Sequence, residues 1–176
     1  MIARNRMGKS LLKDRSGAAA LEFALVVPFL LLTIMATLEA GWTMVQTIML
    51  DRALDQTVRE LRIGSLPNPT QASLRRRVCE HALVLNDCNN TLALELFRIQ
   101  GTSGYPSDDT RCVNRSSSAA PVLRFAQAGR AEVMFVRACF VVRPITPGLG
   151  LGLALRRDES GDMRIISKSG FVNEPA

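Results

Sequence analysis

The stretch that decides the fold of this chain is GAAALEFALVVPFLLLTIMATLEAGW, residues 17–42. Between Ala18 and Leu38 its only charged residue is Glu22. At a rise of about 1.5 Å per residue, a helix of this length reaches about 30 Å, the thickness of the hydrocarbon core of a bilayer. The stretch therefore predicts a single membrane-spanning helix, with one carboxylate placed where its burial is costly.

The residues on either side of the apolar stretch predict its orientation. Residues 1–17 carry five basic side chains and one acidic side chain. Because basic residues stay on the cytoplasmic side, we expect a cytoplasmic N-terminus and the rest of the chain beyond the membrane. A cleaved secretory signal is disfavoured, since the stretch is long and no small-x-small site follows it. At the outer surface, Trp42 is expected as an interfacial anchor and Glu39 as an acid that faces solvent or headgroups.

The helical pattern continues past the membrane to about residue 63, before Gly64 as the expected helix stop. The predicted apolar face of this extension consists of Val45, Ile48, Met49, Ala53, Leu54, Val58 and Leu61. Inside the apolar stretch, Pro28 removes one helix hydrogen bond. It predicts a local kink, the alternative being that the membrane helix merely tolerates it.

The remaining residues, 65–176, predict an α+β domain. The expected elements are a helix over 70–85, strands over 91–99 and 132–142, a surface loop over 101–121, and a hairpin of 151–156 with 163–173. These strands would form a small antiparallel sheet that packs on the second half of the long helix, so that the apolar faces of both are buried.

Four cysteines lie beyond the predicted membrane segment, at Cys79, Cys88, Cys112 and Cys139. In the predicted topology they face an oxidising compartment, where structural disulfides persist. Three pairings are open, and the nine-residue separation of the first two favours Cys79–Cys88 with Cys112–Cys139. With no Cys-x-x-Cys and one histidine, zinc binding and thioredoxin-like chemistry are not expected.

No group of residues points to catalysis, so the chain is expected not to be an enzyme and to hold no metal and no cofactor. His81 lies in a predicted helix without a paired acid and is expected to be structural or solvated. Gly148, Gly150 and Gly152 lack the Lys-Ser/Thr of a phosphate loop and the spacing of a dinucleotide site. We expect them in a flexible turn that leads into a strand.

The net charge of +6 does not predict nucleic-acid binding. Aromatic residues make up only 5% of the chain, which is poor material for stacking on bases. The one dense basic run outside the leader, residues 75–77, has no aromatic neighbours. A mixed, solvated surface is the favoured interpretation.

The N-terminal residues resemble the processing site of type IV prepilins. A basic leader ends in Gly17, and Ala18-Ala19-Ala20-Leu21-Glu22-Phe23 and an apolar run with Pro28 follow. In that class a membrane-embedded prepilin peptidase cuts after the glycine, and the fifth residue of the mature chain is acidic. Mapped here, the cut makes Ala18 the new N-terminus and Glu22 the fifth residue. Phe23 fits the aromatic often found next.

The sequence is most similar to the TadE-like family, the pseudopilins of tight-adherence (Flp) pilus systems. Residues 17–42 resemble the family's N-terminal signature over their whole length. VRACFVVRPITP, residues 136–147, resembles its strand with Cys before a Pro-containing turn, and GFVNEPA, residues 170–176, resembles its closing Asn-Glu-Pro. Residues 64–130 match only in outline. The resemblance implies a pilin-like layout of a long helix on a sheet.

The resemblance implies a pseudopilin or minor pilin that supports assembly of a tight-adherence pilus. Its expected parts are a cleaved cytoplasmic leader (1–17), a transmembrane helix (18–40), an amphipathic extension (41–64) and a periplasmic domain (65–176), held in the bacterial inner membrane. Its expected partners are prepilin peptidase, other pilins and pseudopilins, and the inner-membrane assembly platform. The alternative is an uncut single-pass anchor that carries a periplasmic binding domain.

Glu22 has two interpretations. In an assembling filament, its carboxylate would meet the Ala18 ammonium of a neighbouring subunit, so that two charges that are costly to bury alone compensate each other. The alternative is that Glu22 lies near the cytoplasmic headgroups and snorkels to them. Whether the subunit enters the filament or stays at its base is open.

Overall fold

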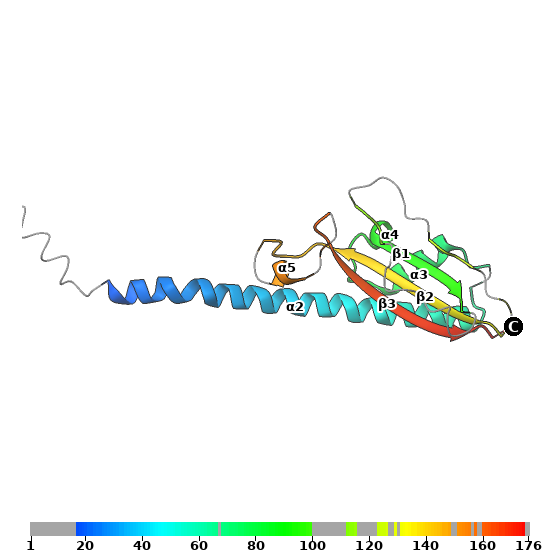
Figure 1. The fold of residues 1–176 in the computed structure, drawn as a ribbon. Coiled ribbons are helices and arrows are strands. Elements are labelled where there is room, and N and C mark those ends of the chain that lie inside the picture. The colour runs from blue at the N-terminus through cyan, green and yellow to red at the C-terminus, as the bar shows by residue number, and fades with distance from the viewer. Residues whose placement is uncertain are drawn as a thin grey trace, which may run out of the picture.

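A long helix and a small sheet make up the computed structural model, which describes residues 17–66, 68–99, 112–115, 123–126, 129, 131–148, 151–155, 157 and 160–174. Helix α2 (Ala18–Arg62) projects alone over its N-terminal half and enters a domain over its C-terminal half (Figure 1). The other elements are α3 (Gln71–His81), α4 (Cys88–Thr91), β1 (Leu92–Arg98), β2 (Val133–Val142), α5 (Leu151–Ala154) and β3 (Met163–Val172). The predicted α+β class and the predicted extent of the long helix are confirmed.

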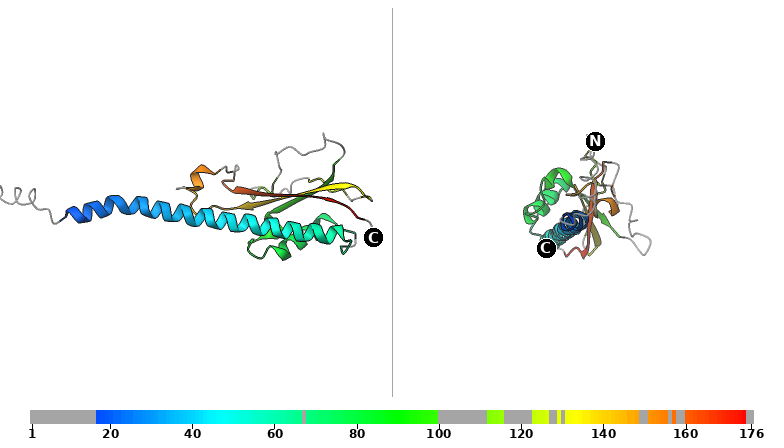
Figure 2. Two further views of the ribbon diagram at one scale, coloured as in Figure 1. Left: turned by 90° about the horizontal axis from the view of Figure 1, so that it is seen from below. Right: turned by 90° about the vertical axis from the view of Figure 1, so that its left-hand side faces the viewer.

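The sheet has three antiparallel strands in the order β1-β2-β3. Helix α2 packs mainly against β3, and α3 packs against both α2 and β1. The two helices thus lie side by side against the sheet, with α2 running along its length (Figure 2). This is the long helix on a small antiparallel sheet that the sequence predicted.

The core lies between the helices and one face of the sheet. The predicted alternation of Leu92, Leu94 and Leu96 in β1 is confirmed, because all three are buried in this core. The other large core side chains include Leu50, Leu54, Leu74, Val78, Met134, Val136 and Phe140. Apolar residues at a period of two on the strands meet apolar residues at helical spacing, and this match holds the layers together.

The buried face of α2 differs from the predicted one at its start. Val45 and Ile48 are 42% and 55% exposed, and they lie on the far side of the helix from Leu50. The buried positions before Leu50 are instead polar, Glu39 and Gln46. Apolar residues surround the helix here, so periodicity alone could not show which side the domain covers.

The predicted hairpin of 151–156 with 163–173 is wrong in its first half. Residues 151–154 form the short helix α5, and β3 pairs with β2, while one isolated bridge joins Arg157 to Met163. A Cβ atom on Gly152 would lie 2.1 Å from the carbonyl oxygen of Thr146. The chain therefore folds back tightly at Gly152, where we had expected a flexible turn into a strand. Gly150 lies outside the described residues.

Other boundaries follow local chemistry. Helix α3 begins where Thr70 and Ser73 cap each other, and it ends at His81, before the predicted residue 85. The 91–99 and 132–142 strands match β1 and β2 within one residue. Most of the predicted loop over 101–121 lies outside the described residues.

The favoured disulfide pairing is confirmed. Cys79 of α3 bonds Cys88 of α4, with 5.6 Å between their Cα atoms. Cys112 bonds Cys139 of β2, with 5.5 Å between their Cα atoms. One bridge ties the end of α3 to α4, which leads into β1, and the other ties the long connection before β2 to the sheet.

A cluster of charged side chains joins α2 to α3. Nε of Arg77 donates to Glu60 at 2.6 Å, and Nε2 of His81 lies 3.1 Å from the same carboxylate. The expectation that His81 has no paired acid is therefore wrong, because the acid comes from 21 residues away on another helix. The hydrogen bond from Arg77 lowers the pKa of the Glu60 carboxyl below its ordinary value of 4.5, against the opposing effect of desolvation.

This cluster predicts a pH-dependent contribution to stability. A carboxyl with a lowered pKa in the folded state stabilises the fold above its unfolded value, here about 4.5, and loses that contribution as the pH falls through the folded value. We expect Glu60→Gln to lower the urea midpoint of the detergent-solubilised chain at neutral pH. The difference from the wild type should shrink below about pH 4.5.

The matched control is Asp51→Asn, which changes an exposed acid on the same helix without an ion pair among the described residues. It should leave the midpoint nearly unchanged at every pH. A deficit in Glu60→Gln that stays constant down to strongly acidic pH would contradict the ion-pair account.

Candidate membrane anchor and assembly site

Gly17 is the residue before the first helical position. Helix α2 begins at Ala18, and the carbonyl oxygen of Gly17 accepts from the amide of Leu21 at 3.1 Å. Gly17 has φ −86° and ψ −5°, which any residue adopts. A Cβ atom there would meet nothing within 4 Å. The fold of the described residues therefore does not require a glycine at this position.

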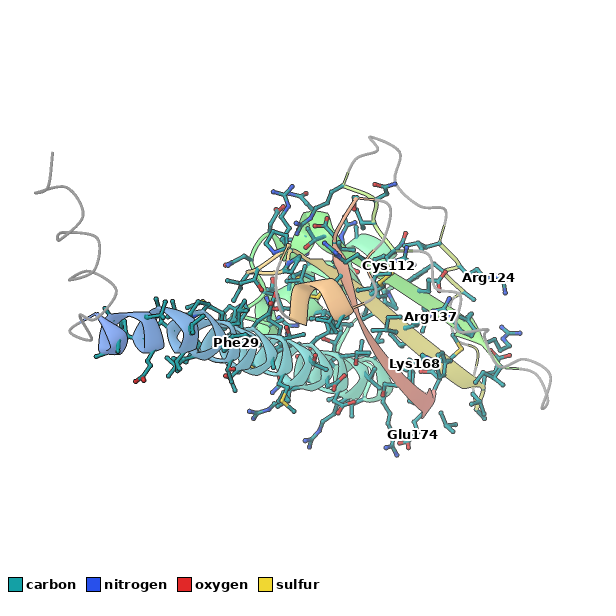
Figure 3. All side chains as sticks on the ribbon, turned by 60° about the vertical axis from the view of Figure 1, so that its left-hand side comes forward. Phe29, Cys112, Arg124, Arg137, Lys168 and Glu174 are labelled. Carbon is teal, nitrogen blue, oxygen red and sulfur yellow. A yellow bond between two sulfur atoms is a disulfide. The ribbon has the colours of Figure 1, made fainter. Side chains whose placement is uncertain are left out.

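The N-terminal half of α2 stands clear of its own domain. Every residue from Ala18 to Met35 is exposed except the half-buried Val27, and Phe23 and Phe29 are 70% and 73% exposed. Figure 3 shows Phe29 on this bare part of the helix. By length and composition α2 is the candidate membrane-spanning helix among the described residues. Such a row of exposed apolar side chains is stable only in lipid or against other proteins.

Glu22 lies in the second turn of this bare segment, four residues after Ala18. Its carboxylate is exposed and has no hydrogen bond or ion pair with any described residue. Phe23 beside it is also free of the domain. The structure thus brings Gly17, Ala18, Glu22 and Phe23 together within two turns of helix, and it leaves Glu22 without an intramolecular partner in the described chain.

The helix runs through Pro28 without a break. The Thr33 hydroxyl donates to the carbonyl of Phe29 at 2.8 Å, so a polar side chain in the apolar segment is satisfied within its own helix. A kink at Pro28 stays a prediction.

Glu39 is where the structure departs most from the sequence. We had expected an acid that faces solvent or headgroups, but its side chain is only 1% exposed. It accepts from the hydroxyl of Thr146 and, at 3.3 Å, from the amide of Thr146. Thr146 belongs to a part of the chain that we call the foot, which consists of residues 144–148 and 151–155 and contains α5, in contact with α2. Because Glu39 and Thr146 are 107 residues apart, no local pattern could have shown the contact.

A second buried acid was also missed. Glu95 of β1 and Arg137 of β2 stand opposite each other in the sheet and are each 6% exposed. Nε of Arg137 donates to the Glu95 carboxylate at 2.9 Å. The sign that could have revealed the pair is an opposite charge in the middle of each of two largely apolar strands. Figure 3 shows Arg137 on the sheet near Lys168, which faces it from β3.

One groove lies between the C-terminal part of α2 and the end of β3. It has a volume of about 790 Å³ and is lined by Asp55, Val58, Arg59, Arg62, Val133, Gly170, Phe171 and Val172. Arg62 pairs with Glu174 at its rim. Neither His81 nor any of the N-terminal site residues lines it. Within the described residues no group of three or more His, Cys, Asp or Glu is placed to hold a metal ion.

The Glu39 contact predicts how firmly the foot is held to the helix. A hydrogen bond to a charged group contributes about 1.5–3 kcal/mol. We therefore expect Glu39→Ala to raise the rate of amide hydrogen exchange in residues 144–155 by about tenfold or more, since 1.4 kcal/mol corresponds to a factor of ten. Thr146→Val should do the same to a smaller extent, because it keeps the backbone donor.

Asp51→Ala is the matched control, an exposed acid three turns further along α2. Its foot amides should exchange as in the wild type. Unchanged exchange in Glu39→Ala would show that the foot is held by other contacts.

Comparison with known proteins supports the resemblance in the N-terminal helix. The model of the family described as TadE-like protein matches residues 17–59. No curated protein and no solved structure matches the chain. The matched range begins at Gly17 and covers all of α2 except its last three residues. The match agrees with the resemblance seen in the sequence, and the chain carries a TadE-like segment at residues 17–59.

Proposed function

We propose that this protein is a pseudopilin or minor pilin that supports assembly of a tight-adherence pilus. The TadE-like match indicates involvement in such pilus systems in general. The observation that carries the finer proposal is that the matched segment coincides with a helix whose first half stands clear of its own domain. A subunit built this way stores its apolar half in lipid before assembly and packs it against neighbouring helices afterwards.

Processing by prepilin peptidase after Gly17 is the first step of this proposal. The cut would remove the basic leader and give Ala18 a free ammonium group at the start of α2. Support comes from the freedom around Gly17, because the fold gives no reason for a glycine there. A protease that must bind the extended chain closely would explain the glycine, because glycine lets another backbone approach without a side chain in the way.

Glu22 is the residue we propose to direct assembly. Its carboxylate has no partner in the described chain, and lipid would not supply one. The Ala18 ammonium of a neighbouring processed subunit would, and an unpaired member of a buried pair is strongly disfavoured. Only the helix register that joins the two charges is then stable. Phe23, beside the charge, would pack against the neighbouring helix.

The rest of the molecule is proposed to be a periplasmic domain held in the inner membrane. The two disulfides favour an oxidising compartment for the domain, and the basic leader favours a cytoplasmic N-terminus. Partners would be prepilin peptidase, other pilins and pseudopilins, and the assembly platform in the inner membrane. The proposed work is packing and contact between subunits, with no turnover of a substrate.

The second candidate is an uncut anchor that carries a binding domain. The groove between α2 and β3 is the observation that favours it, because it offers an arginine, an acid and apolar side chains at one site. The mature N-terminus separates the two candidates, since only the pseudopilin is cut.

We expect intact-mass measurement to find a chain that starts at Ala18 in cells with active prepilin peptidase and at Met1 in cells without it. Gly17→Ala should fold and insert as the wild type does but remain uncut, because its Cβ has free space in the fold.

The control is Gly41→Ala, at a glycine inside α2 whose Cβ would also meet nothing within 4 Å. It should be cut normally. A wild-type chain that still begins at Met1 beside active peptidase would favour the uncut anchor.

The second test concerns Glu22. Glu22→Ala should insert into the membrane and be cut at the wild-type level, yet fail to support piliation. Asp51→Ala, which removes an exposed acid from the same helix outside the apolar segment, should support it fully. Normal piliation with Glu22→Ala would favour the interpretation that Glu22 only snorkels to the headgroups.

A further inference from the structure

We propose that the foot, residues 144–148 and 151–155, makes a second contact with the membrane, seated among phospholipid headgroups beside the point where α2 emerges. The inference rests on the proposed membrane anchor and adds a lipid-binding surface to the domain. Four features of the foot support it: its height along the helix, its composition, its exposed side chains and its closed shape.

The height of the foot is set by Glu39. The carboxylate binds Thr146, so the foot touches α2 at the first residue after the apolar run that ends at Leu38. From Ala18 to Glu39 the helix rises by about 31 Å, the thickness of one hydrocarbon core. Figure 1 shows α5 beside α2 on the side of the bare half, ahead of the sheet. A bilayer around residues 18–38 therefore ends at the level of the foot.

The composition of the foot suits a lipid interface. Residues 144–155 read PITPGLGLGLAL and contain no charged residue. Arg143 precedes them, and Arg156 and Arg157 follow. Apolar residues that enter the headgroup layer, with arginines at the edges to bind phosphate, are what surface-bound segments present to a membrane.

The exposed side chains of the foot are the ones that this contact needs. Ile145 is 57% exposed although it is apolar, and the side chain of Arg143 is 77% exposed although it approaches Asp162. Arg157 is exposed as well. Trp42 lies about one turn after Glu39 on α2 and is 41% exposed. Tryptophan is one of the side chains that are enriched at membrane surfaces.

The foot is also held by contacts between its own residues and with Arg157, which follows it. Arg157 donates from Nη1 to the carbonyl of Pro147 at 2.6 Å. Gly152 lies against the Thr146 carbonyl with no room for a side chain. The two contacts join the described parts of the foot before and after residues 149–150, and Ile145 stays exposed.

The test uses the fact that Trp42 is the only tryptophan. In a Trp42→Phe background, Ile145→Trp places a single reporter on the foot. Val172→Trp is the matched control, because Val172 is 47% exposed and lines a groove beside Arg59 and Arg62, far along α2 from Glu39. Each full-length chain is reconstituted into vesicles of phosphatidylcholine and phosphatidylglycerol, with or without bromine on the acyl chains.

We expect the tryptophan at position 145 to show blue-shifted emission and to lose most of it to brominated lipid. The tryptophan at position 172 should emit as it does in water and lose little. Quenching at position 145 should weaken when phosphatidylglycerol is left out or when Arg143→Gln is added, because the arginine loses its anionic partner.

The wild-type chain with Trp42 separates this inference from the membrane anchor itself. Trp42 quenched with position 145 unquenched would overturn the foot contact and leave the anchor standing. Neither quenched would show that α2 is not inserted, and the foot contact fails with it. Blue-shifted emission at position 145 without quenching by bromine would show that protein, such as a second copy, covers the foot, and would overturn the contact with lipid.

Discussion

The packing of Leu50, Leu54 and Val58 against the sheet is the constraint on which the rest of the molecule depends. Because these residues are buried at one side of α2, they fix both the height and the rotation of the domain on the helix. Going back towards the N-terminus, the helix continues without a break to Ala18. The residues before Leu38 therefore project from the domain as an exposed apolar helix. The apolar N-terminal segment is exposed because the core is placed where it is.

The junction between the two halves has its own chemistry. On the side of α2 that faces the domain, apolar burial stops at Leu50, and the buried residues before it are Gln46 and Glu39. The buried carboxylate of Glu39 gives specificity, because it needs a partner at a defined place. Thr146 supplies it for Glu39. The foot is therefore positioned by directed hydrogen bonds, whereas the sheet is positioned by apolar area.

Local patterns in the sequence predicted those features whose cause is local. The apolar run, the period of two in β1 and the nine-residue spacing of Cys79 and Cys88 each led to a feature that the structure contains. The prediction failed where the partner is distant in sequence. Glu39 needed Thr146, and His81 needed Glu60, before either could be understood. The strand expected at 151–156 failed because a close backbone approach at Gly152 outweighed alternation.

The unbroken course of α2 has a mechanical consequence. The helix spans 45 residues, or about 68 Å, and is continuous from Ala18 to Arg62. Because the domain is packed on the C-terminal half of α2, a torque or a pulling force applied near Ala18 is transmitted along the helix to the sheet. If α2 rotates about its own axis by 100°, the angle between successive residues of a helix, the domain attached to its C-terminal half rotates by the same angle.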